Sequence, residues 1–235
     1  LPDTHELGCH VSGHESLNVC DAGPDEAEHT LALVGASRMA HWHPAISAVA
    51  EEQGWRLLTL TRNGCLFGAD DPDDGRQDPD CREWKEQAMD TLERLRPDVV
   101  VTSSTRTRTH EEEHVPEGYL RTWQRLDDLG IDVVGIRDLP RREASGADCV
   151  ADGGLPEDCA EPALRSLAAH DPAARADLPA NVTLVDLTEA VCPDGRCDAV
   201  IGNVLVFWDH SHMTATYART LTPQMLLALK EATGW

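Results

Sequence analysis

The sequence has 235 residues, of which 41% are hydrophobic and 26% charged, as is typical of a globular protein large enough to bury a core. Its 42 acidic and 20 basic residues give a formal net charge of −22 at pH 7, which argues against nucleic acid or anionic membranes as the main partner. No apolar run approaches the roughly 20 residues that cross a bilayer. We find no internal repeat or linker, and we therefore expect one domain over residues 1–235.

The eight cysteines form four pairs that are close in the sequence. An even number of cysteines in close pairs indicates disulfides and an oxidising compartment. No Cys-x2-Cys spacing is present, so a zinc site is disfavoured and we expect no metal. Pairing between sequence neighbours is one of many possible connectivities, and the choice among them stays open at this point. The neighbours are Cys9 and Cys20, Cys65 and Cys81, Cys149 and Cys159, and Cys192 and Cys197.

In chain order, residues 1–30 are polar and contain several glycines, and they are expected to form an irregular lead-in closed by the first cysteine pair. From residue 31 onward, strand-like and helix-like segments alternate. Strands are predicted at residues 31–34, 56–60, 98–102, 131–136, 181–185 and 204–208. Helices are predicted at residues 39–53, 81–96, 111–129, 162–170 and 214–233.

Two longer segments are predicted to be loops, residues 61–80 and residues 137–160. The first contains the acidic run of residues 70–75, which resembles a calcium-binding loop only loosely because no glutamate closes it. A solvated acidic loop is the favoured interpretation. The alternation of strands and helices predicts an α/β fold with a mainly parallel sheet in a three-layer α/β/α sandwich.

A candidate nucleophile follows the first predicted strand. Gly35, Ala36 and Ser37 come directly after the apolar run and before a helical pattern. In an open α/β sheet, ligands bind at the carboxyl ends of the strands, and N–H groups at a helix N-terminus favour developing negative charge. Taken alone, this pattern is more typical of a turn with a helix cap than of a catalytic serine.

A candidate base and its acid lie near the other end of the chain. Asp209 and His212 are three residues apart, after the last apolar run and before the last predicted helix. This spacing allows the carboxylate to orient the imidazole while the second ring nitrogen faces a serine hydroxyl. Each residue by itself also suits an ordinary polar turn.

The two motifs together resemble those of the SGNH (GDSL-like) hydrolase superfamily, and most closely the extracytoplasmic SGNH domain fused to acyltransferase-3 membrane proteins. The resemblance extends from about Cys9 to the end of the chain and is weakest over residues 105–180. It rests on a cysteine-bounded loop after the second strand, on the segment from Cys192 to Leu221, and on the block Leu33-Val34-Gly35-Ala36-Ser37-Arg38-Met39-Ala40-His41-Trp42-His43-Pro44-Ala45.

The resemblance implies roles for several residues. Ser37 would be the nucleophile, His212 the general base and Asp209 the acid that orients it. The backbone N–H groups of Ser37 and Gly64 would bind the oxyanion. Ser103 stands where the family has an asparagine as a third donor.

The block around the serine departs from the family at two positions. Ala36 and Arg38 replace the aspartate and histidine that flank the family's serine. Arg38 is expected to hold an anionic group in the cleft, and Trp42 and Trp208 are expected to lie beside the cleft. Because the chain lacks both the hydrogen bonds of that aspartate and the asparagine, a catalytically weakened domain stays an open alternative.

The resemblance implies an extracytoplasmic domain of a longer membrane protein. Its transmembrane acyltransferase part would supply an acyl group, expected to be acetyl. This domain would pass that group to a sugar hydroxyl of an envelope or extracellular glycan through an acyl-serine intermediate, without a cofactor. The alternatives are a carbohydrate O-acyl esterase and a glycan-binding domain without activity.

Overall fold

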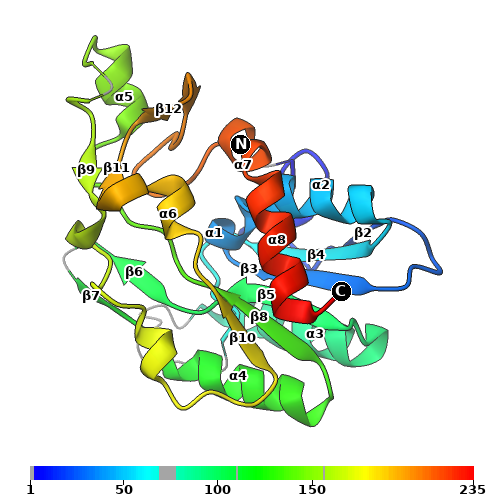
Figure 1. Ribbon diagram of the computed structural model, residues 1–235. Helices are drawn as coiled ribbons and strands as arrows, with labels where there is room; N and C mark the ends of the chain where they lie inside the picture. The colour runs from blue at the N-terminus through cyan, green and yellow to red at the C-terminus, as the bar shows by residue number, and fades with distance from the viewer. Residues whose placement is uncertain (1–2, 69–77, 110, 156) are drawn as a thin grey trace.

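A computed structural model describes residues 3–68, 78–109, 111–155 and 157–235 (Figure 1). Its centre is a seven-stranded sheet in which six strands run parallel in the order β1-β4-β3-β5-β8-β10. The seventh strand, β2 (Cys20–Ala22), runs antiparallel to β4. The bounds of the parallel strands are β1 His10–Val11, β3 Thr30–Gly35, β4 Arg56–Arg62, β5 Val99–Ser103, β8 Asp132–Ile136 and β10 Val182–Val185.

Helices cover both faces of the sheet, as predicted for a three-layer α/β/α sandwich. On one face lie α1 (Ser37–Ala40), α2 (His43–Gln53), α7 (Ala215–Thr220) and α8 (Thr222–Thr233). On the other face lie α3 (Pro79–Leu95) and α4 (Glu117–Asp128), at the bottom of Figure 1. The predicted fold class is therefore confirmed.

The apolar strands explain why the sheet lies between two cores. Successive side chains of a strand point to opposite faces. Leu31 and Leu33 accordingly join the cluster under α2 and α8, whereas Ala32 and Val34 join the cluster under α3 and α4. A strand that is apolar on both faces fits the centre of a parallel sheet, and β3 occupies that place.

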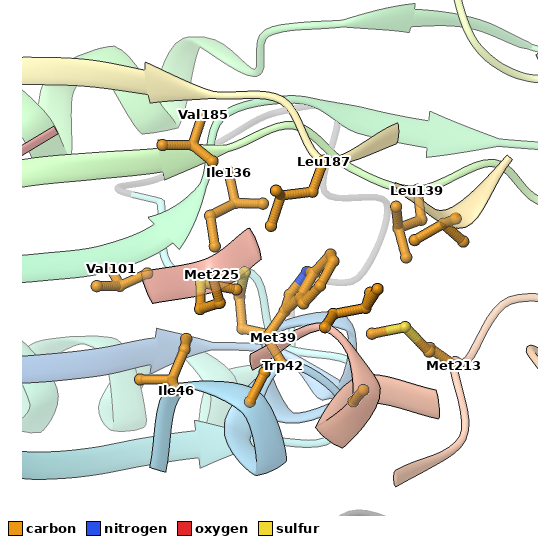
Figure 2. Packing of buried hydrophobic residues seen from close by; sticks show 14 of the residues in the cluster. Met39, Trp42, Ile46, Val101, Ile136, Leu139, Val185, Leu187, Met213 and Met225 are labelled. Carbon is orange, nitrogen blue, oxygen red and sulfur yellow. The ribbon is translucent and has the colours of Figure 1, made fainter. Parts of the chain in front are cut away.

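Figure 2 shows the first of these clusters at close range. Trp42, from the turn between α1 and α2, lies among Met39, Ile136 and Leu187 and is only 1% exposed. Met213, from the loop before α7, packs against the same cluster. The segments before α2 and before α7 are thus anchored in one core.

A smaller structure extends beyond one end of the sheet, at the upper left of Figure 1. It holds α5 (Gly146–Ala151), α6 (Thr188–Val191), the antiparallel strand pair β9 and β11, and the hairpin β12–β13. The remaining short elements are β6 Arg106–Arg108, β7 Glu111–His114, β9 Glu161–Pro162, β11 Arg196–Cys197, β12 Val200–Ile201, β13 Val204–Leu205, and the 3-10 turns Ala163–Arg165, Pro172–Arg175 and Pro193–Gly195.

All eight cysteines form disulfides between sequence neighbours. The pairs are Cys9–Cys20, Cys65–Cys81, Cys149–Cys159 and Cys192–Cys197. The expectation of four disulfides is therefore met, and the structure selects the local connectivity among those that the sequence left open.

Two predicted helices are each divided by a proline. The helix predicted at residues 39–53 is α1 and α2, because Pro44 lacks the N–H that would continue the ladder. The helix predicted at residues 214–233 is α7 and α8, and Pro223 stands in the first turn of α8. A proline at this position starts a helix rather than continuing one.

Five other assignments were wrong in part, the last of which concerns residues 204–208. The helix predicted at residues 111–129 begins only after Pro116, and Glu111–His114 form strand β7. The residue before a proline avoids helical backbone angles, which explains the break. The helix predicted at residues 162–170 is strand β9 and a single 3-10 turn. The lead-in supplies β1 and β2, and the loop at residues 137–160 contains α5.

The run predicted as a strand at residues 204–208 is only the short β13, which pairs with β12 outside the main sheet. The acidic segment of residues 70–75 lies outside the described residues. Within the described part of the chain, no helix has the length and apolar character needed to cross a membrane.

Leu33 provides a test of this core. Its side chain is fully buried in β3, so Leu33→Ala removes apolar contacts and leaves a cavity. We expect the free energy of unfolding to fall by about 2–5 kcal/mol, measured by urea denaturation. Leu227→Ala on α8, where the leucine is 70% exposed, is the matched control and should change it by less than about 0.5 kcal/mol. Equal effects would contradict the burial of Leu33.

Candidate active site

The candidate site lies where β3, β4 and β5 end. A cavity of about 230 Å³ opens there, and its walls include Ser37, Gly64, Ser103, Arg106, Arg141 and His212. We call it the arginine cavity. Parallel strands bring their carboxyl ends to one edge of the sheet, so residues that follow different strands meet in this cavity. The predicted position of the site is therefore the position of a real cavity.

A tight turn places Ser37 at the start of α1. Gly35 ends β3 with a φ of +150°, and a Cβ at this position would lie 2.7 Å from the Cγ of Met39. Only glycine allows this turn. Ala36 is extended and makes no side-chain cap, so the free N–H groups of the first turn of α1 are not used by a capping side chain.

Ser37, His212 and Asp209 form a continuous hydrogen-bonded series. The Oγ of Ser37 is 2.8 Å from Nε2 of His212, and Nδ1 of the same ring is 2.7 Å from Oδ2 of Asp209. With the Nδ1 proton directed to the carboxylate, Nε2 is left to accept the serine proton. The three side chains thus meet in the predicted arrangement, and their catalytic roles stay a prediction.

The loop before α7 holds the carboxylate in place. Oδ1 of Asp209 accepts hydrogen bonds from the backbone N–H groups of Ser211 and His212, each at 2.7 Å. Burial raises the pKa of Asp209, but these donors and the imidazole outweigh it, so the pKa is lower than usual. Asp209 is therefore ionised at neutral pH, as the acid that orients a base must be.

Gly64 and Ser103 both line the arginine cavity with Ser37. Gly64 has a φ of +66°, a backbone conformation that side chains disfavour. Ser104, which follows Ser103 in the chain, is fully buried, and its hydroxyl has no hydrogen-bond partner among the described residues. The positions of Gly64 and Ser103 suit oxyanion donors, and this role stays a prediction.

Arg38 does not take the predicted position as a free ligand for an anionic group. Its Nε donates to Oδ1 of Asp138 at 2.5 Å, and its other nitrogens donate to the carbonyl groups of Ser211 and Leu139. The side chain is 8% exposed. Because its donors are engaged within the protein, Arg38 links the turn of the nucleophile to the loop of His212.

This link continues into a buried network of polar groups. Oδ2 of Asp138 accepts from the backbone N–H and the hydroxyl of Thr107. Thr105 donates to Glu113 at 2.7 Å, and Glu113 pairs with Arg137 at 2.7 Å. The segments after β5 and β8 are therefore fastened together behind the site. No motif in the sequence marks these residues, since each contact joins distant segments.

Trp42 is also misplaced by the sequence prediction. Its side chain is 1% exposed and packs in the core of Figure 2, so it does not form a surface beside the cleft. Trp208, which is also predicted to lie beside the cleft, does line a cavity with Ser37 and His212. It is 37% exposed and stacks on His212, with ring centroids 5.3 Å apart.

A second cavity, of about 240 Å³, also reaches Ser37 and His212. Its walls include His5, His10 and Trp208, and we call it the histidine cavity. No pattern in the sequence signals this cavity, because the polar lead-in predicts only irregular structure. Within the described part of the chain, no group of three or more His, Cys, Asp or Glu side chains is arranged to hold a metal ion.

The fold and the meeting of Ser37, His212 and Asp209 define an SGNH hydrolase-like protein. The sequence matches the family model of the SGNH domain fused to AT3 domains over residues 8–226. The chain therefore belongs to this family, and the resemblance inferred from the two motifs is confirmed. No curated protein matches the sequence.

A solved structure shows the same fold. The periplasmic domain of a lipopolysaccharide acetyltransferase from Salmonella ser. Paratyphi A aligns with a TM-score of 0.63 and 13% identity, over 94% of this chain and 86% of that one. Two further matches are weaker. A carbohydrate acetylesterase family member from Sinorhizobium meliloti aligns with a TM-score of 0.49 and 14% identity, over 88% of this chain and 100% of that one. A carbohydrate esterase family 2 enzyme from Corynascus thermopiles aligns with a TM-score of 0.48 and 14% identity, over 91% of this chain and 69% of that one.

The buried Arg38–Asp138 pair leads to a stability prediction. Arg38→Met removes the cation and leaves the Asp138 carboxylate, which is 8% exposed, without its ionic partner. We expect the free energy of unfolding to fall by about 3–5 kcal/mol in urea denaturation at pH 7.

Arg125→Met is the matched control for this change. Arg125 lies on the surface, 3.8 Å from Asp90 and from Glu93, and is about half exposed. Exposed pairs of this kind contribute about 0–1 kcal/mol. A loss at Arg38 no larger than the loss at Arg125 would show that the buried pair does not hold the two segments together.

His10 in the histidine cavity leads to a prediction about pH. Burial, followed by repulsion from His5 and His212, lowers the pKa of His10 to about 4 from its ordinary 6.5. Between these values the unfolded chain binds a proton that the folded chain does not, so stability decreases as the pH falls through this window.

The His10→Asn variant removes that contribution. We expect the loss of unfolding free energy between pH 7.5 and pH 5 to be smaller in the variant than in the original chain. Asparagine keeps a polar group near the hydroxyl of Thr61, 3.0 Å from the imidazole. Urea denaturation at the two pH values measures the difference, and an unchanged difference would contradict the prediction.

Proposed function

We propose that this domain transfers an acyl group, in the first place acetyl, to a sugar hydroxyl through an acyl-Ser37 intermediate. The observation that carries the proposal is the 2.8 Å hydrogen bond between Oγ of Ser37 and Nε2 of His212, with Asp209 on the opposite ring nitrogen. An alcohol needs such a base to become a nucleophile at neutral pH. Family membership in the SGNH domains fused to AT3 domains supports the same reaction class.

The geometry supports two half-reactions. In the first, Oγ of Ser37 attacks the carbonyl carbon of the acyl donor while Nε2 of His212 takes the hydroxyl proton. The tetrahedral oxyanion forms near the N-terminus of α1, where backbone N–H groups stabilise it, with Gly64 on the same cavity wall. The intermediate then expels the donor's leaving oxygen, which receives the proton from His212.

In the second half-reaction, a sugar hydroxyl gives its proton to Nε2 and attacks the acyl-Ser37 carbonyl. Collapse of this second tetrahedral intermediate returns the proton to Ser37 and releases the acylated sugar. Two cavities reach Ser37 and His212, which supports separate approaches for the acyl donor and the acceptor. When water takes the place of the sugar hydroxyl, the same site acts as an esterase.

The setting of the reaction follows from the family and the cysteines. Four disulfides favour an oxidising, extracytoplasmic compartment. A fused AT3 domain would deliver the acyl group from the membrane side, so the domain would belong to a longer, membrane-anchored protein. The relative from Salmonella is a lipopolysaccharide acetyltransferase periplasmic domain, which supports a glycan of the cell envelope as the acceptor.

A serine-directed reagent tests the nucleophile. A fluorophosphonate should add its mass to the tryptic peptide that contains Ser37, because the His212 base activates that hydroxyl. Intact-mass and peptide mass spectrometry measure the adduct. Ser37→Ala should abolish it, whereas Ser47→Ala on α2 should leave it unchanged.

The outcome that would end the proposal is a folded protein in which no residue is labelled, or in which another residue is labelled. Far-ultraviolet circular dichroism of each variant establishes that the fold is retained. A domain that binds glycans without labelling would instead be the non-catalytic alternative.

A further inference from the structure

Arg141 lies in the wall of the arginine cavity, together with Ser37 and His212. It follows β8 in the chain, and its Nε donates to the carbonyl oxygen of Thr107 at 2.8 Å. This hydrogen bond fixes the plane of the guanidinium group at one edge. The two terminal nitrogens make no hydrogen bond with the described residues, and they are available to a ligand in the cavity.

Within the described part of the chain, Arg141 also lacks an ionic partner of the kind that Arg137 and Arg142 have. Arg137 pairs with Glu113 and Asp186, and Arg142 lies 3.7 Å from Glu161. No described carboxylate lies within ion-pair distance of Arg141. The nearby carboxylate of Asp138 is already saturated by Arg38 and Thr107.

The surroundings of Arg141 are unfavourable for a cation. Burial, followed by repulsion from Arg38, lowers the pKa of Arg141 to about 10. Repulsion from Arg106 acts in the same direction, and attraction to Asp138 and Asp209 offsets part of the shift. Arg141 is still charged at neutral pH. An anion that entered the arginine cavity would compensate this charge, although the formal net charge of the whole protein is −22.

We propose that the arginine cavity binds an anionic substituent of the acceptor sugar, a carboxylate or a phosphate, through Arg141. The inference rests on the proposed function, since it names the class of acceptor for the same serine. A planar guanidinium with two terminal nitrogens unoccupied matches the two oxygens of a carboxylate or phosphate. The cavity of about 230 Å³ has room for one sugar ring beside Ser37.

This assignment makes Arg141 a specificity-determining residue. A neutral sugar would leave the guanidinium without a partner after displacing its water, which disfavours binding. An acidic sugar would form charge-assisted hydrogen bonds and present a ring hydroxyl to the acyl-serine. The preference should therefore appear in KM for acidic sugars, with little change in kcat.

The test compares three acetylated sugars in the esterase direction, with acetate release as the readout. They are an O-acetyl methyl glucuronoside, the matching O-acetyl methyl glucoside, and an O-acetyl glucose 6-phosphate. We expect kcat/KM for an anionic sugar to exceed that for the neutral one by about 10- to 100-fold. Whichever of the two anionic sugars has the higher kcat/KM shows whether a carboxylate or a phosphate is the group recognised.

Variants assign the preference to Arg141. Arg141→Gln should raise KM for the anionic sugar to the level of the neutral one, and Arg141→Lys should retain part of the preference. Arg94→Gln, which removes the same charge from an exposed position on α3, should retain all of it. Equal kcat/KM for anionic and neutral sugars in the original chain, or equal losses for both in Arg141→Gln, would overturn the inference.

Two further measurements separate this inference from the proposed function. Hydrolysis of 4-nitrophenyl acetate, a small neutral ester, should be measurable in the original chain and unchanged in the control variant Arg94→Gln. Its absence in the original chain would overturn the serine chemistry. In that case NMR titration of the Ser37→Ala variant with methyl glucuronoside and with methyl glucoside still tests the anion site, because binding does not need the nucleophile. Equal affinity for the two sugars would overturn the proposed anion site.

Discussion

The candidate site depends on one buried interaction, the hydrogen bonds that Arg38 makes to Asp138 and to the carbonyl of Ser211. The serine comes from the turn after β3 and the imidazole from a loop 175 residues later. A hydrogen bond of 2.8 Å between them requires these segments to keep a nearly constant separation. Arg38 is the neighbour of the serine and donates to the residue before His212, so it holds this separation directly.

The sheet explains why so few contacts suffice. Strands β3, β4 and β5 are neighbours and parallel, so the segments that follow them begin at one edge already close together. The second shared element is the core, where Trp42 and Met213 lie in one cluster although they precede different helices. Apolar packing in the core therefore positions the two segments that carry Ser37 and His212, and Arg38 joins the same segments at the cleft.

Much of the fold could be predicted because its signals are local. The apolar runs of β3, β5 and β8 are continuous, as buried parallel strands require. Ser37, Asp209 and His212 each stand close to an apolar run in the sequence. What could not be predicted depends on distant partners. Glu113 sits in a run of helix-forming residues, but its pairing with Arg137 and the proline at position 116 draw it into a strand. Likewise Arg38 and Trp42 adjoin the motif in sequence, yet their partners, which decide what each does, come from other segments.

The distribution of charge is the last constraint on the site. A chain with a net charge of −22 repels anions at long range, but at physiological salt this repulsion is screened beyond about 8 Å. Inside the cavity the wall includes the cation of Arg141, while Asp138 and Asp209 are engaged with Arg38 and His212. Arg141 is partly buried and has no ionic partner among the described residues, which costs folding free energy. Its presence beside a candidate nucleophile therefore favours a role in recognition over a role in stability. The acceptor sugar would then be selected through direct contact with Arg141. The same segment after β8 contains Asp138, which holds Arg38 in place.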